Sequence, residues 1–357
     1  MIMGRKLYYY QLKSCVWEIT LACCFACKYC GSKAGIAREN ELTTQECLNV
    51  AKQLADMGCQ RVSLIGGEVF MRPDWPVIVK ALTDRNVTVS IITNGYLFSD
   101  KLISELKKVR IESVAISLDG PEQIHDSFRQ KGSFQRALQA VDVLTENGIP
   151  VSVISTLHSK NVSYMNEMYE ILKKKDIFAW QLQACSPMGN ALQDGFLTEI
   201  DFKSVIQFVE EHIGKSHFAI GIADNIGYYT DSEGYLRGNT CGSAVFPGCR
   251  AGLSSIGIDS TGNVRGCESM YDEVFIEGNL REKTLYEIWN DPNAFSYNRQ
   301  FTVNDLSGNC RNCDYAARCA GGCRSYNYFS HGKLYESRYC VHGLEQLRTS
   351  KVNRKEI

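Results

Sequence analysis

Short apolar runs alternate with helical patterns between residue 15 and about residue 213. Six of these runs have the length and β-branched content of strands, at residues 15–20, 61–65, 87–93, 113–118, 151–156 and 178–184. After the first run, Thr43 to Glu46 has the sequence of a capping box, which opens a helix that ends near Gly58. Such alternation is typical of parallel βα units. The pattern therefore predicts an α/β fold built as a partial, TIM-like (β/α)6 barrel.

Polar or glycine-rich residues follow four of the predicted strands. A cysteine cluster follows the first, Gly66-Gly67-Glu68 the second, Thr93-Asn94-Gly95 the third and Ser117-Leu118-Asp119-Gly120 the fourth. In barrels of parallel strands, the reactive residues lie at the carboxyl ends of the strands. We therefore expect these segments to converge on one mouth.

The character of the sequence changes near Gly221, where a glycine-, cysteine- and tyrosine-rich region with few periodic runs begins. A region that is poor in continuous core commonly needs metal ligation to hold its shape. The full length of 357 residues also exceeds what a single core usually serves. We predict a barrel domain over residues 1–230 and a small cysteine-rich domain with a C-terminal tail over residues 231–357.

The overall charge is close to balanced, with a formal net charge of -1, 44% hydrophobic and 22% charged residues. This balance offers no field for nucleic acid or an anionic membrane. Lys13 and Glu18 interrupt any apolar run long enough for a signal peptide, and no stretch of 18 apolar residues occurs elsewhere. We expect a cytoplasmic protein with neither nucleic acid nor membrane as a partner.

The chain contains 16 cysteines, of which four crowd at residues 23–30 and eight lie between Cys241 and Cys340. In a reducing compartment, clustered thiols are better explained as metal ligands or redox groups than as a disulfide framework. Their uneven distribution predicts two separate metal-binding regions.

The first cysteine cluster fits two registers. Cys23, Cys27 and Cys30 form C-x3-C-x2-C, three thiolates that leave one iron of a cluster open, whereas Cys24 in place of Cys23 gives a ferredoxin-like run that lacks a fourth ligand. A zinc site, with its fourth ligand at Cys24 or further away, is the alternative.

The second region has a longer pattern. Cys249, Gly262 and Cys267 form C-x12-G-x4-C, and the remaining members form C-x2-C-x5-C-x3-C followed by one more cysteine: Cys310, Cys313, Cys319, Cys323 and Cys340. A zinc ribbon would account for part of this set but not for seven matched positions.

These motifs together resemble a known family. C-x3-C-x2-C after one strand and Gly-Gly-Glu after the next resemble the radical S-adenosylmethionine (SAM) superfamily. The downstream set resembles the seven-cysteine SPASM domain, which extends radical SAM enzymes that act on peptides and proteins. The resemblance implies an enzyme with bound SAM and three 4Fe-4S clusters, one that binds SAM and two auxiliary ones.

The resemblance also assigns residues to each cofactor. Cys23, Cys27 and Cys30 would bind the SAM cluster, and the residues expected around SAM are Tyr29, Gly66, Gly67, Glu68, Ser117 and Arg129, with further adenine contacts near Ser186 to Gly189. Cys249, Cys267 and Cys323, with Cys241 as the candidate fourth ligand, would bind the first auxiliary cluster. Cys310, Cys313, Cys319 and Cys340 would bind the second.

Three residues are candidates for catalysis. Glu268 directly follows Cys267, where sulfatase-maturing members of the family carry an aspartate that accepts a proton, so Glu268 is a candidate base and Asp259 a weaker one. Cys185 follows the sixth strand, where it could donate a hydrogen atom to a substrate radical.

The function that the resemblance implies is reductive cleavage of SAM to a 5'-deoxyadenosyl radical, which takes a hydrogen atom from a substrate. We expect a ribosomally made peptide as the substrate, modified by thioether or carbon–carbon cross-linking, epimerisation or oxidation. The alternatives are a protein oxidase of the sulfatase-maturase type, an enzyme acting on a small molecule or cofactor precursor, and a multi-cluster electron-transfer protein without catalysis.

The expected partners follow from this function. Only 22 residues precede Cys23, too few for an N-terminal leader-recognition domain, so the peptide or protein substrate would bind directly or through a separate leader-binding partner. A low-potential electron donor of the flavodoxin or ferredoxin type would supply the reducing electron.

Overall fold

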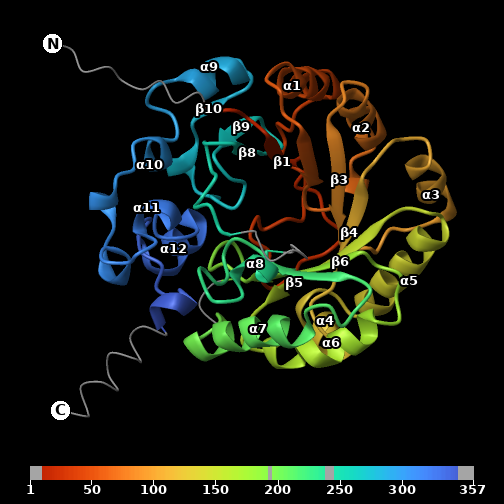
Figure 1. The fold of residues 1–357 in the computed structure, drawn as a ribbon. Coiled ribbons are helices and arrows are strands. Elements are labelled where there is room, and N and C mark those ends of the chain that lie inside the picture. Colours follow the sequence, from red (N-terminus) through yellow and green to blue (C-terminus); the bar gives the residue numbers. More distant parts are fainter. Residues whose placement is uncertain (1–9, 192–194, 238–244, 345–357) are drawn as a thin grey trace, which may run out of the picture.

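The computed structural model describes residues 10–191, 195–237 and 245–344. Within them, ten strands form one sheet in the order β10-β9-β8-β1-β2-β3-β4-β5-β6-β7 (Figure 1). The strands are β1 (Ser14–Glu18), β2 (Arg61–Ile65), β3 (Thr88–Thr93), β4 (Ser113–Ser117), β5 (Val151–Leu157), β6 (Ala179–Ala184), β7 (Ala219–Ile222), β8 (Ser255–Ile258), β9 (Asn263–Arg265) and β10 (Gly278–Asn279).

Strands β1 to β7 pair in sequence order and in parallel. This arrangement confirms the six predicted strands and the partial barrel. The seventh strand was missed because Ala219–Ile222 has only four residues and a glycine at position 221, too short a run to show a period.

Seven helices cover the outer face of the parallel strands (Figure 1). They are α1 (Thr44–Asp56), α2 (Trp75–Thr83), α3 (Asp100–Leu106), α4 (Glu122–Phe128), α5 (Ser133–Glu146), α6 (Met165–Leu172) and α7 (Glu199–His212). The capping box that opens α1 is present, because the Glu46 N–H donates to Thr43 Oγ1 at 3.3 Å and the Thr43 N–H donates to Glu46 Oε2 at 2.8 Å.

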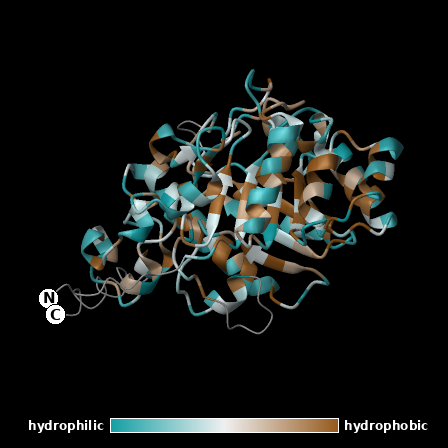
Figure 2. Ribbon diagram, turned by 90° about the horizontal axis from the view of Figure 1, so that it is seen from above, coloured by the Kyte–Doolittle hydropathy of each residue, from teal (hydrophilic) through white to brown (hydrophobic). Residues whose placement is uncertain are grey.

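The two faces of the barrel sheet differ in polarity. Side chains that point outward, such as Cys15 and Trp17 of β1, belong to the apolar core between strands and helices, and Figure 2 shows hydrophobic residues concentrated there. Side chains that point inward, such as Glu18, Ser63 and Thr156, line a cavity instead. Because successive side chains of a strand alternate between faces, one sheet serves both the core and the site.

The cysteine-rich region continues the barrel sheet beyond β1. Strand β8 pairs with β1 in parallel, with Cys15 opposite Ile256 and Trp17 opposite Ile258, and β9 and β10 follow in antiparallel fashion. The short helices α8 (Glu233–Leu236), α9 (Leu285–Asn290), α10 (Ser296–Arg299), α11 (Ala316–Cys319) and α12 (Arg324–His331) complete this region. The division at residue 230 remains a prediction. No helix in the three described ranges is both long and apolar enough to cross a membrane.

Candidate active site

A cavity of about 560 Å³ opens at the carboxyl ends of the barrel strands. Its walls come from β1 to β6, from the loops that follow them and from the segment after β9. The predicted site residues that line it are Cys23, Cys27, Tyr29, Cys30, Gly66, Gly67, Ser117, Arg129, Cys185, Cys267 and Glu268. The structure therefore brings most of the predicted site to one place.

The three cysteines of the first register face this cavity, whereas Cys24 does not. Backbone N–H groups of the same loop donate to two of the sulfurs, from Phe25 to Cys23 Sγ at 3.4 Å and from Ala34 to Cys30 Sγ at 3.3 Å. Hydrogen bonds to sulfur are among the factors that set the potential of an iron–sulfur cluster. The geometry favours the register that uses Cys23.

Cys24 has a different environment. Its Sγ accepts a hydrogen bond from Asn94 Nδ2 at 3.4 Å. The hydrogen bond with Cys23, together with the one from Asn94, lowers the pKa of Cys24 to about 7 although burial opposes the shift. Cys24 is thus an acidic thiol beside the site rather than on its wall.

The two glycines after β2 are needed because this loop lies against the backbone of the cysteine loop. A Cβ at Gly67 would collide with the carbonyl oxygens of Leu21 and Ala22, and one at Gly66 would lie 2.6 Å from the carbonyl oxygen of Thr20. The Gly67 N–H donates to that Thr20 oxygen at 2.8 Å. Close backbone approach therefore explains the Gly-Gly pair.

The role of Glu68 in the segment expected at SAM stays a prediction, and its side chain is not on the cavity wall. Its carboxylate accepts hydrogen bonds from Thr93 Oγ1 at 2.7 Å, the Asn94 N–H at 2.9 Å and the Phe70 N–H at 3.3 Å. Burial raises the pKa of Glu68, and these hydrogen bonds oppose the shift. Glu68 fastens the end of β2 to the end of β3.

Arg129, which ends α4, forms an ion pair with Asp119 through its Nε. The same Asp119 oxygen accepts a hydrogen bond from the Tyr29 hydroxyl, and the guanidinium lies 5.8 Å from the Tyr29 ring centre. Burial would raise the pKa of Asp119, but the charge of Arg129 holds it below its ordinary value. Sequence reasoning noted Asp119 only as part of a strand end and assigned it no role.

Glu268 reaches the cavity from the segment after β9. Its side chain is buried at 6% exposure, and neither carboxylate oxygen has a hydrogen-bond partner within the described residues. Burial first, and then the nearby Glu18, raise the pKa of Glu268 well above its usual range. An unsatisfied buried acid on a cavity wall needs a partner from whatever occupies the cavity.

Asp259, the weaker candidate base, is not on the cavity wall. Its carboxylate caps the turn between β8 and β9, accepting hydrogen bonds from Thr261 and Asn263 and pairing with Arg265 at 3.0 Å. Both oxygens are occupied, and these partners hold the pKa of Asp259 low against the effect of burial. A role of Asp259 as a base stays a prediction, and the structure gives its carboxylate partners within the β8–β9 turn.

An unpredicted group joins the two regions of the chain beside Glu268. Arg38 donates to Glu18 Oε1 at 2.5 Å, to Ser260 Oγ and to the Tyr271 hydroxyl. Glu18 and Tyr271 both line the cavity. The only signal for this group in the sequence is an acidic residue, Glu18, at an inward position of an apolar strand.

Cys185 lies at the end of β6 as expected and lines the cavity. It is buried, which raises its pKa to about 12, so the thiol is protonated at neutral pH. The loop after it, where adenine contacts were expected, lines the cavity with Ser186 and Met188 and binds the cysteine loop, since the Asn190 N–H donates to the Cys30 carbonyl at 2.9 Å.

The seven downstream cysteines form two groups. Cys249 and Cys267 pack against one apolar cluster, and Cys249 lies close enough to Cys267 and Cys323 for its charge, after burial, to raise the pKa of both. Since Cys267 also lines the main cavity, this group borders the candidate active site. Cys241, the predicted fourth ligand, lies outside the described residues.

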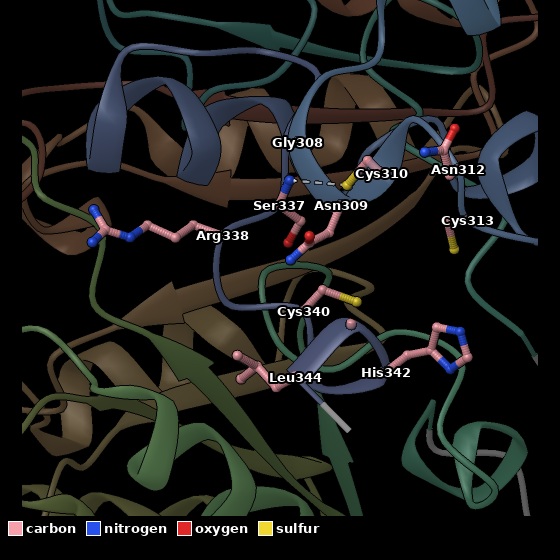
Figure 3. Close-up of a pocket in the computed structure, with 11 residues that line it drawn as sticks. Gly308, Asn309, Cys310, Asn312, Cys313, Ser337, Arg338, Cys340, His342 and Leu344 are labelled. Carbon is pink, nitrogen blue, oxygen red and sulfur yellow. Dashed lines mark hydrogen bonds between the residues drawn. The ribbon is translucent and has the colours of Figure 1, made fainter. Parts of the chain in front are cut away.

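The second group surrounds a separate cavity of about 320 Å³. Figure 3 shows Cys310, Cys313 and Cys340 around it, and the Ser337 N–H donates to Cys310 Sγ at 3.3 Å. Cys319 does not line this cavity, but it packs near Cys340, and burial and then the charges of Cys340 and Cys310 raise its pKa. In the part of the chain that the structure describes, no three His, Cys, Asp or Glu side chains lie at the spacing that a single metal ion requires.

The fold places three cysteines at the mouth of a partial parallel barrel and two further cysteine groups beyond it, and clustered thiols of this kind suit iron–sulfur ligation. Residues 17–172 match the radical SAM superfamily, and residues 249–314 match the SPASM iron–sulfur cluster-binding domain. The chain therefore carries a radical SAM domain followed by a SPASM domain, and it is an enzyme, as its named relatives are. These domains imply iron–sulfur clusters and SAM as cofactors.

Relatives of the whole chain have different named activities. An AdoMet-dependent heme synthase of Methanosarcina barkeri is 27% identical over 338 residues, which cover 91% of this chain and 95% of the relative. The mycofactocin maturase MftC of Mycolicibacterium smegmatis is 27% identical over 324 residues, covering 88% of this chain and 78% of the relative.

Solved structures share the fold. Streptococcus suis SuiB bound to S-adenosylmethionine superposes with a TM-score of 0.75 at 17% identity, covering 93% of this chain and 77% of SuiB. The structure of anSMEcpe with bound AdoMet and the Kp18Cys peptide gives 0.72 at 18% identity, covering 96% and 97%. At these identities the likeness establishes the fold alone.

Proposed function

We propose that this enzyme removes a hydrogen atom from a peptide substrate and matures a ribosomally made peptide by cross-linking, epimerisation or oxidation. The observation that carries the proposal is the single cavity that holds Cys23, Cys27 and Cys30 on one side and Glu268 on another. A substrate in this cavity would lie between a SAM site and an unsatisfied acid.

The residues present fit the absent cofactors. Three thiols with backbone donors to their sulfurs suit a 4Fe-4S cluster with one open iron, and the paired glycines leave room for a ligand against the backbone. Bound there, the reduced cluster and SAM supply the 5'-deoxyadenosyl radical. Tyr29, Ser117 and Arg129 would surround SAM.

Two auxiliary clusters would bring the number of clusters to three. We assign the first to Cys249, Cys267 and Cys323, with Cys241 as the candidate fourth ligand, and the second to Cys310, Cys313, Cys319 and Cys340. The position of Cys267 on the main cavity wall supports a role of the first cluster in taking up the electron left on the substrate.

A peptide fits the charges of the cavity better than a polyanion does. Among the described residues, Arg129 is the one basic side chain on its wall and is paired with Asp119; Glu18 is likewise paired with Arg38, and Glu268 is an acid without a partner. SuiB bound to its precursor peptide SuiA, and anSMEcpe bound to a peptide, have the same fold. The second candidate is a cofactor-precursor enzyme, which the similarity to the heme synthase over nearly the whole chain favours.

Within this function, Glu268 would accept the proton that the substrate loses on oxidation; because its raised pKa keeps the carboxyl group protonated, it must first release its own proton. Cys185 would donate a hydrogen atom where the product keeps its oxidation level. Replacing Glu268 with glutamine should leave SAM cleavage intact and abolish oxidised product. Replacing Cys185 with alanine should abolish an epimerised product. Unchanged product in either variant would remove that role.

The first experiment is anaerobic reconstitution with dithionite and SAM, followed by measurement of 5'-deoxyadenosine. Absence of 5'-deoxyadenosine from protein with full iron content would contradict radical chemistry and favour the electron-transfer alternative.

The second experiment is coexpression with small open reading frames encoded nearby, with mass spectrometry of each peptide. Loss of two hydrogens would indicate cross-linking or oxidation. An unchanged mass in ordinary water, with deuterium uptake when the reaction is run in heavy water, would indicate epimerisation. No change in any peptide would contradict the proposed substrate class.

The remaining partners also belong to this proposal. A flavodoxin- or ferredoxin-type donor would deliver the electron, a separate protein could present the leader peptide, and a cytoplasmic location would keep the clustered thiols reduced.

A further inference from the structure

Asp119 joins four separate elements at the mouth of the barrel. It follows β4 and is buried at 2% exposure. One carboxylate oxygen, Oδ2, accepts hydrogen bonds from the Tyr29 hydroxyl of the cysteine loop and from Arg129 Nε at the end of α4. The other oxygen, Oδ1, accepts the Thr156 N–H of β5 at 2.8 Å.

The backbone of Asp119 is bound just as completely. Its N–H donates to His125 Nδ1 at 3.1 Å, and its carbonyl accepts Asn161 Nδ2 at 2.7 Å. These bonds place the carboxylate independently of any ligand in the cavity. Asp119 is therefore a fixed acceptor for the two side chains that donate hydrogen bonds to it, Tyr29 and Arg129.

The contact with Asp119 uses only one edge of the Arg129 guanidinium. The two terminal nitrogens donate no hydrogen bond within the described residues. Neither is among the fully buried nitrogens that lack a partner, and Arg129 lines the cavity. A guanidinium held by Nε presents those two N–H groups as a fork, the geometry that binds a carboxylate in bidentate fashion.

We propose that Asp119 is a positioning residue for SAM: it holds Arg129 so that the free fork meets the methionine carboxylate, and it ties Tyr29 and the cysteine loop to the same point. The inference rests on the proposed function of Arg129. Sequence spacing could not show it, because Asp119 lies 90 residues from Tyr29 and 37 from Thr156.

Two substitutions separate position from charge. Asp119→Glu keeps both oxygens and the charge but moves the carboxylate by one methylene, so Arg129 must shift. Asp119→Asn removes the charge and replaces one carboxylate oxygen with an NH2 group. That NH2 group then faces another donor, the N–H of either Thr156 or Arg129, and cannot accept its hydrogen bond. Asp142→Asn is the matched control, because Asp142 pairs with Lys175 at 2.7 Å on the outer face and touches nothing in the cavity.

The test measures binding, not turnover, by equilibrium dialysis of the reconstituted, unreduced holoprotein with SAM and with decarboxylated SAM. Wild type and Asp142→Asn should prefer SAM. In Asp119→Glu and Asp119→Asn, the dissociation constant for SAM should rise about tenfold while that for decarboxylated SAM stays the same, the loss expected for a misaligned bond to a charged group.

Each outcome decides one question. If wild type does not prefer SAM over decarboxylated SAM, the proposed role of Arg129 fails. If wild type does prefer SAM and Asp119→Glu keeps the same preference, the positioning role of Asp119 is wrong. Tighter SAM binding by Asp119→Asn would show that Asp119 only tunes charge, which also overturns the proposal. If the Asp119→Asn variant loses its cluster, the test rests on Asp119→Glu, which keeps both carboxylate oxygens as hydrogen-bond acceptors.

Discussion

Cys23 and Cys24 are adjacent, yet the fold gives them different surroundings. Cys23 lines the cavity and Cys24 does not, although Asn94 on the cavity wall donates to both sulfurs, to Cys24 at 3.4 Å and to Cys23 at 3.9 Å. Position on the cavity wall therefore distinguishes the two neighbouring thiols.

This difference predicts opposite results for two alanine variants. Cys24→Ala should keep full iron content and SAM cleavage, because it removes no thiol from the cavity wall. Cys23→Ala should lose 5'-deoxyadenosine formation and the iron of one cluster while keeping the auxiliary clusters. Iron analysis and chromatography of 5'-deoxyadenosine measure both, and the reverse result would show that Cys24 is the ligand.

His125 predicts a pH dependence of stability. Burial first, and then the charge of Arg129, lower its pKa to about 4, whereas an unfolded histidine titrates near its ordinary value of 6.5. Between these two values the unfolded chain binds a proton that the folded chain does not, so the free energy of unfolding should rise with pH across this window by about 3 kcal/mol.

Urea denaturation of wild type and His125→Asn at several pH values tests this expectation. Asparagine can still accept the Asp119 N–H, and His158, whose pKa burial also lowers to about 4, remains in both proteins. The difference between the two proteins should therefore change with pH only between about 4 and 6.5. A constant difference would mean that His125 takes up its proton in the folded state.

The loop after β6 closes the candidate site by lying on the cysteine loop. Gly189 has a φ of +63° and approaches so closely that a Cβ would collide with the carbonyl oxygens of Cys30 and Gly31. Asn190 adds a second link through its side chain, which donates to the Cys27 carbonyl at 3.0 Å. The two loops must therefore move together.

Gly189→Ala should push these loops apart and reduce the iron content and SAM cleavage of the isolated protein. Gly148→Ala is the control, since Gly148 has a φ of +71° but no atom within 4 Å of an added Cβ. It should cost only the left-handed strain of about 1 kcal/mol and keep full activity. Equal losses in both variants would show that backbone strain, not close approach, matters at Gly189.

Arg38 joins the barrel to the cysteine-rich region across the cavity. Its partners come from β1 (Glu18), from the turn after β8 (Ser260) and from the segment after β9 (Tyr271). Leu42 adds a backbone link, donating to the Ser260 carbonyl at 2.7 Å. The wall that carries Glu268 is thereby fixed relative to β1.

Arg38→Met should destabilise the protein by about 3 kcal/mol, because it leaves the Glu18 carboxylate, 1% exposed, without its ion pair. Arg61→Met, which removes the exposed pair with Glu112, should cost less than about 1 kcal/mol. Urea unfolding followed by tryptophan fluorescence measures both. Similar values for the two variants would show that the Arg38 contacts do not hold the regions together.

Sequence spacing was sufficient for features that depend on neighbours along the chain. Strand periodicity, the capping box at Thr43 and the cysteine motifs are local, so β1 to β6 and the gathering of the site cysteines followed from them. Spacing failed for β7, which is too short, and it gave no sign that the Asp259 carboxylate binds groups of the β8–β9 turn.

Only the tertiary structure decided which side chains meet. Glu18 and Tyr271 lie 253 residues apart, and Arg38 and Ser260 lie 222 apart, yet the pairing of β8 with β1 places them on one wall. The same packing turns Glu68 into a link between strand ends and Asp119 into an anchor. Local sequence specifies elements and ligand types, whereas the partner of a buried charge depends on how distant strands pair, and no spacing along the chain records that.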